Sequence, residues 1–132
     1  MIVVDACVWA EALTNDGKLG EWARDQVDAE DLCLVSEHTR LEGANSIRAL
    51  FLRGELDERR GRDALDLLGL LEMDVVPCQY VFGRVWELRS TVTAYDAASV
   101  AIAEQDQCPL VTTDLTLVGA PGPVCEFRTP QS

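Results

Sequence analysis

The amino-acid sequence predicts an α/β protein, a three-layer α/β/α sandwich around a mostly parallel sheet of about five strands. Short apolar runs without alternation, such as Ile2–Val4 and Leu110–Val111, are typical of strands buried on both faces. The run from Ala97 to Ala103 is almost uniformly apolar, so we expect a helix there that packs on the sheet. Strands that alternate with helices favour a parallel sheet with right-handed crossovers.

The first half of the chain alternates between strands and helices. The strands are expected at 2–4 and 32–35, and the helices at 8–13, 19–27, 37–53 and 58–71. Ser36 is expected to cap the third helix, Gly54 to end it, and Asp57 to open the fourth. The apolar positions of these two helices, which include Leu41 and Leu65, recur at three- and four-residue steps. This spacing predicts a helical hairpin with an inward apolar face.

The second half of the chain places polar side chains where a buried strand ends. The expected elements are a strand at 74–77, a helix at 80–88, a helix from 96, a strand at 110–111 and an edge strand at 124–127. Pro109 bars the helix from continuing, and Thr112 to Asp114 follow the strand at its carboxyl end. Open parallel sheets bind ligands at that edge.

The length of 132 residues predicts one domain, 1–132, large enough to bury about two-thirds of its unfolded surface. Asp5 and Glu11 interrupt the apolar N-terminal stretch, so no signal peptide is expected. No apolar run approaches the ~20 residues of a membrane span. We therefore expect a soluble, cytoplasmic protein without a membrane partner.

The five cysteines are widely spaced and never form a Cys-x-x-Cys pair. Most lie beside apolar, strand-like runs, which indicates reduced and buried thiols. A catalytic thiol or a zinc site is the alternative. It lacks the usual base and ligand partner, because His38 is the single histidine of the chain.

The charge balance is strongly acidic, with 23 acidic residues, 11 basic residues and a formal net charge of -12. Such a balance disfavours nucleic acid as a partner by bulk electrostatics. Arginines nevertheless concentrate between positions 40 and 62. One interpretation is that they form a local basic face on an acidic molecule. Acidic residues such as Glu55, Glu58 and Asp66 interleave with them, so we favour a solvated helix pair with internal ion pairs.

Carboxylates from remote positions are predicted to meet at one edge of the sheet. Asp5 and Asp114 follow strands, and Asp96 begins a helix. Glu42 lies near the apolar stripe of the third helix and can join them. Each aspartate alone is explained more simply as a turn former or a helix cap. Together they form a cluster that must bind protons, pair with basic groups or hold cations.

The cluster points to a divalent ion and to phosphate chemistry. Carboxylate oxygens and water suit Mg²⁺ or Mn²⁺, and neither lysine nor histidine lies in these motifs. An ion held there activates water and stabilises a charged phosphoryl group, which favours phosphodiester hydrolysis. It also inverts the local field, so a phosphate backbone is accepted despite the acidic composition. A non-catalytic phosphate receiver is the alternative, but no lysine follows the late strands.

The motifs around these acids resemble those of the PIN-domain ribonucleases and, more narrowly, the VapC toxins of bacterial toxin-antitoxin pairs. The matching segments, in chain order, are 2–8 (IVVDACV), 41–45 (LEGAN), 95–98 (YDAA) and 110–117 (LVTTDLTL). The resemblance covers nearly the whole chain. It implies a compact α/β/α sandwich, an acidic Mg²⁺ or Mn²⁺ site, and an endoribonuclease that acts on single-stranded or loop RNA.

Carried over position by position, the resemblance assigns the catalytic, metal-holding acids to Asp5, Glu42, Asp96 and Asp114. Thr112 matches the hydroxyl residue that steadies them. Cys7 departs from the serine or threonine that is usual two residues after the first acid. The resemblance further implies a homodimer and a cognate VapB-type antitoxin whose tail covers the site. A purely interacting module on the same fold is the remaining alternative, and the intact acids argue against it.

Other aromatic and basic side chains receive no role from the sequence. Trp9, Trp22 and Trp86 each lie within a helical apolar pattern, so we expect core or interface packing. Stacking on RNA bases is the alternative. His38 is expected on the surface beside the start of the third helix.

Overall fold

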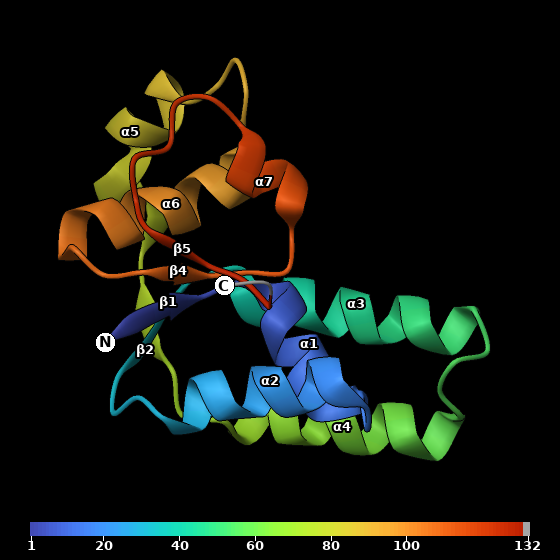
Figure 1. Ribbon diagram of the computed structural model, residues 1–132. Coiled ribbons are helices and arrows are strands. Elements are labelled where there is room, and N and C mark those ends of the chain that lie inside the picture. Colours follow the sequence, from blue (N-terminus) through green and yellow to red (C-terminus); the bar gives the residue numbers. More distant parts are fainter. Residues whose placement is uncertain (131–132) are drawn as a thin grey trace.

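The computed structural model describes residues 1–130, and a parallel sheet lies at its centre (Figure 1). The strand order is β3-β2-β1-β4-β5, and each neighbouring pair is parallel. The strands are β1 (Ile2–Val4), β2 (Cys33–Ser36), β3 (Asp74–Val76), β4 (Leu110–Val111) and β5 (Phe127–Arg128). The helices are α1 (Ala6–Thr14), α2 (Lys18–Asp28), α3 (Thr39–Leu52), α4 (Glu58–Leu70), α5 (Phe82–Glu87), α6 (Ala94–Asp106) and α7 (Leu115–Gly119), with a 3-10 turn η1 (Cys78–Val81) before α5. The predicted α/β class is confirmed.

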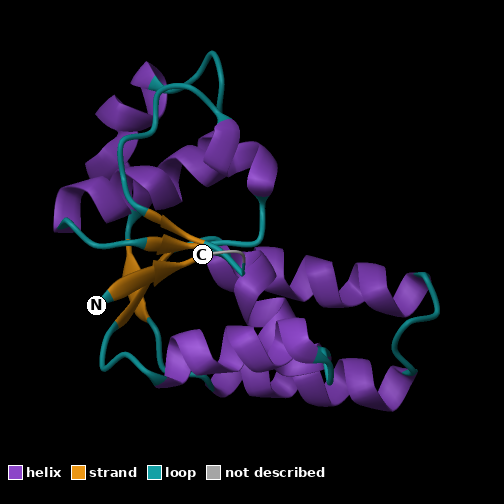
Figure 2. Ribbon diagram, in the orientation of Figure 1, coloured by secondary structure: helices purple, strands orange, loops and turns teal. Residues whose placement is uncertain are grey.

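Helices cover both faces of the sheet (Figure 2), which confirms the predicted three-layer sandwich. Successive residues of a strand point to opposite faces. Val3 therefore packs with α6 on one face, whereas Ile2 and Val4 pack on the other face with residues of α1 to α4. In Figure 1, α5, α6 and α7 lie above the sheet, and α1, α2 and α4 lie below it. Strand β1 is thus buried on both sides, as its sequence predicted.

Helix α6 lies against the sheet with its apolar run fully covered. Every residue from 97 to 103 is buried, as the composition predicted. The cap of this helix is Thr93, whose Oγ1 accepts a hydrogen bond from the Asp96 N–H at 3.3 Å. Asp96 lies in the first turn, where the helix dipole still favours a negative charge. Gln107 ends the helix in the left-handed conformation (φ 53°), and the chain turns back into β4.

The register of the central strands brings two segments of chemical importance together. Val4 of β1 pairs with Val111 of β4, and the Asp5 N–H donates to the Val111 carbonyl at 3.0 Å. Because the two strands run in parallel, their carboxyl ends meet at one edge of the sheet. Asp5 and Thr112 therefore leave the sheet side by side.

Several predictions are wrong at the ends of elements. Ser36 does not cap α3, because it ends β2 and His38 holds the cap position. Asp114 caps a short helix, α7, which was not among the expected elements. The edge strand begins at Phe127, and Val124 before it is exposed. Helix ends fray and terminal turns vary, so a local sequence pattern locates an element better than it locates the ends of the element.

Helices α3 and α4 form the predicted hairpin, but their apolar faces are only partly buried. Ile47 and Leu68 lie in the core, whereas Leu41, Phe51 and Leu65 are exposed. Periodicity marks the apolar side of a helix and does not tell what covers it. The exposed residues line a groove of about 860 Å³ between the two helices.

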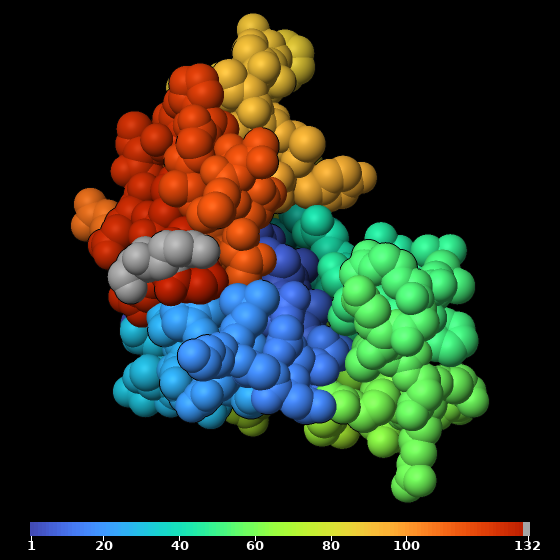
Figure 3. Space-filling model, turned by 45° about the vertical axis from the view of Figure 1, so that its right-hand side comes forward, coloured from blue at the N-terminus to red at the C-terminus, as the bar shows by residue number. Residues whose placement is uncertain are grey.

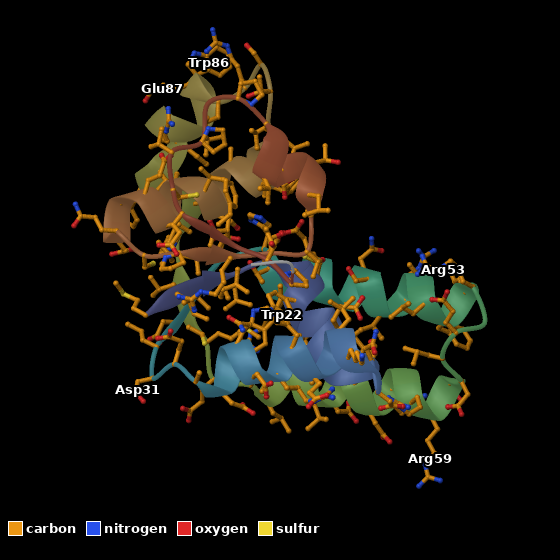
Figure 4. All side chains as sticks on the ribbon, viewed as in Figure 1. Trp22, Asp31, Arg53, Arg59, Trp86 and Glu87 are labelled. Atoms are coloured by element: carbon orange, nitrogen blue, oxygen red, sulfur yellow. The ribbon has the colours of Figure 1, made fainter. Side chains whose placement is uncertain are left out.

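Trp86 follows only one part of the prediction of core or interface packing, and the arginine-rich hairpin agrees with the interpretation favoured for it. Trp86 is 67% exposed at the outer end of the molecule (Figure 4), so it is not a core residue. The Arg89 guanidinium lies 4.3 Å from its ring centroid. Trp9 is buried as expected. The favoured interpretation of the hairpin is supported by ion pairs such as Arg62 with Glu58, at 2.9 Å.

All five cysteines are free, which agrees with the predicted reduced thiols. Cys78 and Cys108 are buried, and the other three are half-buried, so the prediction of burial is only partly right. In the part of the chain that the structure describes, no helix has both the length and the apolar character needed to cross a membrane.

Candidate active site

A pocket of about 450 Å³ lies at the carboxyl edge of the sheet, and all four predicted acids line it. Figure 3 shows the surface hollowed between the orange and yellow segments above and the green α3 region below. The four acids come from different elements. Asp5 follows β1, Glu42 lies in α3, Asp96 lies in the first turn of α6, and Asp114 caps α7. The tertiary fold therefore gathers side chains that are remote along the chain.

Asp5 is the most firmly held of the acids. It is 9% exposed, and its Oδ1 accepts a hydrogen bond from the Ala6 N–H at 2.9 Å. Its Oδ2 accepts from the Thr112 hydroxyl at 2.8 Å, and the Cys7 thiol lies 3.6 Å from the same oxygen. These contacts fix the orientation of the carboxylate, as a binding group requires.

Asp96 and Glu42 show that the acids repel one another. Burial, followed by the charges of Asp5 and Asp114, raises the pKa of Asp96 to about 6. Burial, followed by the charges of Asp5 and Asp96, raises the pKa of Glu42 to about 7. Desolvation and like charge both disfavour the ionised form of a carboxyl group. Carboxyl groups perturbed in this way within a pocket are typical of functional sites.

Thr112 and Asp114 connect the end of β4 to the pocket. Thr112 is fully buried, and its Oγ1 accepts from the Asp114 N–H at 3.1 Å while it donates to Asp5. The Asp114 Oδ1 accepts from the N–H groups of Thr116 and Leu117 at 3.0 and 3.2 Å. Thr112 thus lies where a supporting hydroxyl was expected, behind the acids rather than on the pocket wall.

His38 also lies in this pocket, although sequence reasoning placed it on the surface without a role. Its Nε2 is 3.0 Å from Glu42 Oε1, and 19% of its side chain is exposed. The spacing between His38 and Glu42 is the sequence signal that could have revealed the place of His38 in the pocket. His38 precedes Glu42 by four residues at the start of a helix, which places both side chains on one face.

The donor set of the pocket fits a hard divalent cation. Among the described residues, neither lysine nor arginine lines it, so the repulsion between the carboxylates has no strong basic partner. Within residues 1–130, no group of three or more His, Cys, Asp or Glu side chains is arranged to hold a metal ion. An ion such as Mg²⁺ does not need a preformed cage of protein ligands, because it usually takes one or two carboxylates and keeps several waters, so the carboxylates of the pocket suit it.

Comparison with known proteins identifies relatives that cover nearly the whole chain. The family model of the PIN domain matches residues 2–120. Ribonuclease VapC9 of Mycobacterium tuberculosis is 42% identical over 117 residues, which span 89% of this chain and 88% of that protein. Among solved structures, FitAcB from Neisseria gonorrhoeae matches with a TM-score of 0.72 and 18% identity, covering 99% of each chain. A toxin-antitoxin complex from Klebsiella pneumoniae matches with a TM-score of 0.61 and 20% identity, covering 98% of each chain.

Proposed function

We propose a function from the premise that this chain belongs to the PIN domain family and is a relative of the VapC ribonucleases. The protein is a metal-dependent endoribonuclease that hydrolyses RNA phosphodiester bonds, and it acts as the toxin of a toxin-antitoxin pair. One observation carries the proposal. It is the pocket that brings together the carboxylates of Asp5, Glu42, Asp96 and Asp114.

The carboxylates divide into two proposed roles. Asp5 and Asp96 are the ligands of a Mg²⁺ or Mn²⁺ ion, and Glu42 and Asp114 hold it directly or through water. When bound, such an ion lowers the pKa of a water molecule and stabilises negative charge on the phosphoryl group. Thr112 keeps Asp5 in one orientation for this purpose, through the 2.8 Å hydrogen bond to Oδ2.

The electrostatics of the pocket make RNA binding depend on a cation. The side chains that line it include four carboxylates, and the whole chain has a formal net charge of -12. A phosphate group is repelled by such a surface unless a cation compensates the carboxylates. The alternative of a phosphate receiver is not favoured, because no lysine is present among the described residues that line the pocket.

Cleavage of a labelled RNA pool tests the proposal. Asp5→Asn and Asp96→Asn keep the shape of the side chain and remove its charge, so both variants are expected to lose cleavage while keeping the fold. Asp106→Asn is the matched control, because Asp106 lies at the opposite end of α6, outside the pocket. EDTA is expected to stop the wild-type protein, and added Mg²⁺ or Mn²⁺ to restore it. Full cleavage by Asp96→Asn, or by the wild type in EDTA, contradicts the proposal.

The groove between α3 and α4 is the proposed site of a VapB-type antitoxin. Leu41 and Asn45 line both this groove and the acidic pocket, so the two hollows adjoin. A partner segment with an apolar face can bind the groove and extend over the carboxylates. Leu65→Asp places a charge in the groove, away from the acids, and is expected to abolish co-purification with the product of a neighbouring antitoxin reading frame. Unchanged co-purification contradicts this placement.

We place the protein in the cytoplasm and propose that it forms a homodimer. Tyr80 of η1 and Phe82 and Trp86 of α5 are exposed aromatic residues, and they support a self-association surface, because exposed apolar patches mark interaction sites. Sedimentation of the purified protein measures the mass. Trp86→Glu is expected to shift it toward the monomer, and a wild-type protein that sediments as a monomer contradicts the proposal.

A further inference from the structure

His38 occupies a distinct position in the acidic pocket. It is the residue just before α3, and its imidazole is the only basic side chain among the described residues that line the pocket. Its Nε2 lies 3.0 Å from Glu42 Oε1, one helical turn further along. At that distance the two atoms share a hydrogen bond, with the imidazole N–H as the donor.

The imidazole is held from several sides by other elements. The Ser36 hydroxyl at the end of β2 lies 3.1 Å from Nε2 and 3.3 Å from Nδ1. The Cys78 thiol of η1 is 3.6 Å from Nδ1. The Tyr95 ring of α6 meets the imidazole edge-on, with 5.2 Å between the ring centroids. With Nε2–H donating to Glu42, Nδ1 is free to accept from Ser36 or Cys78, so one tautomer fits all of these neighbours.

Glu42 needs such a partner to stay at the pocket. Its side chain is 37% exposed, and a glutamate has several rotatable bonds that let it swing into solvent. Burial, followed by the charges of Asp5 and Asp96, disfavours its ionised form and raises its pKa. An N–H donor from the wall of the pocket opposes both tendencies. An imidazole with a proton on Nε2 supplies that donor.

We propose that His38 is a positioning residue of the metal site, which fixes the Glu42 carboxylate toward Asp5 and Asp96. This inference rests on the proposed metal-dependent function. His38 then serves as a hydrogen-bond donor to Glu42, like the groups that orient metal-binding carboxylates in other proteins. His38 acts through Glu42 and does not itself touch the ion or the RNA.

Calorimetric titration of the apoprotein with Mn²⁺ tests the inference without any measurement of activity. His38→Gln places an amide N–H near the position of Nε2. His38→Asn places an amide N–H near the position of Nδ1, and this shorter side chain cannot reach Glu42. We expect His38→Asn to weaken Mn²⁺ binding by about 10-fold or more and His38→Gln to retain most of the affinity. Arg62→Leu is the control, because it removes another i,i+4 partner, that of Glu58 on α4, and neither residue lines the acidic pocket.

A double-mutant cycle with Glu42→Gln separates positioning from a general structural role. If His38 acts through Glu42, His38→Asn causes no further loss of Mn²⁺ affinity once Glu42 is neutral. Equal losses in both backgrounds overturn the inference, and so does wild-type affinity in His38→Asn. A wild-type protein that binds no Mn²⁺ overturns the proposed function and this inference together. Weak binding in Glu42→Gln with full binding in His38→Asn overturns the inference alone.

Discussion

The Thr112 hydroxyl donates a 2.8 Å hydrogen bond to Asp5 Oδ2 and joins two residues 107 positions apart. The same oxygen of Thr112 accepts from the Asp114 N–H at 3.1 Å. Thr112 is fully buried, so water cannot take its place. One side chain thereby links the ends of β1 and β4 to the orientation of two acids in the pocket.

Thr112→Val is expected to destabilise the protein by about 1–3 kcal/mol, because it leaves a buried carboxylate oxygen and an amide without their partner. RNA cleavage is expected to fall as well, since Asp5 loses its fixed orientation. Urea unfolding measures the stability. Thr112→Ser keeps the hydroxyl and is the control. A Thr112→Val variant as stable as Thr112→Ser and the wild type would contradict the role of the hydroxyl hydrogen bonds.

The protein without divalent ions is expected to lose stability as the pH rises from about 5 to about 8. The pKa values of Glu42 (about 7) and Asp96 (about 6) lie above their unfolded values, so the folded state binds more protons in this range. The contribution is complete below the unfolded pKa values and is lost as the pH passes the folded ones. Melting temperatures across the range measure it. Asp96→Asn is expected to flatten the profile, and an unchanged slope contradicts the assignment.

The Cys7 thiol is expected to resist alkylation in the folded protein. Burial, followed by the charge of Asp5, raises its pKa to about 11. At neutral pH it therefore holds roughly two orders of magnitude less reactive thiolate than an ordinary cysteine. Mass spectrometry of the Cys7 peptide after brief treatment with iodoacetamide measures this, with protein in urea as the reference. Labelling at equal rates in both states contradicts the expectation.

Two glycines are expected to respond to alanine in opposite directions. A Cβ at Gly20 would lie 1.7 Å from the Asn15 carbonyl oxygen, so Gly20→Ala must displace the turn between α1 and α2. We expect a loss of about 1–3 kcal/mol. A Cβ at Gly69 in α4 meets nothing within 4 Å. Gly69→Ala is expected to add about 0.4–1 kcal/mol by restricting the unfolded chain. Thermal unfolding compares them, and a stable Gly20→Ala variant would refute the close approach.

Much of the fold could be predicted because local chemistry already specifies it. The apolar β1 and the almost uniformly apolar α6 each describe an element that must be covered. Asp5 and Asp114 could be placed together because each follows a strand, and parallel strands end at one edge. Glu42 and Thr112 carried a weaker local signal, and their assignment depended on the resemblance to the PIN-domain ribonucleases.

Other features could not be predicted, because they depend on which remote element arrives at a given place. His38 becomes part of the pocket only when η1 and α6 bring Cys78 and Tyr95 against its ring. Leu41 and Leu65 have the spacing of core residues, yet no element among residues 1–130 covers them. Trp86 likewise lies in an apolar helical pattern and ends in solvent.

The sequence by itself determined the class of fold, the order of its strands and longer helices, and the acids at the strand ends, since each follows from the chemistry of a few adjacent residues. Only the tertiary structure decided the hydrogen-bond partners of those acids, the place of His38 and the exposure of the groove. The physical reason is that periodicity shows which face of an element is apolar, whereas contacts between remote elements decide whether that face is buried and by which residues.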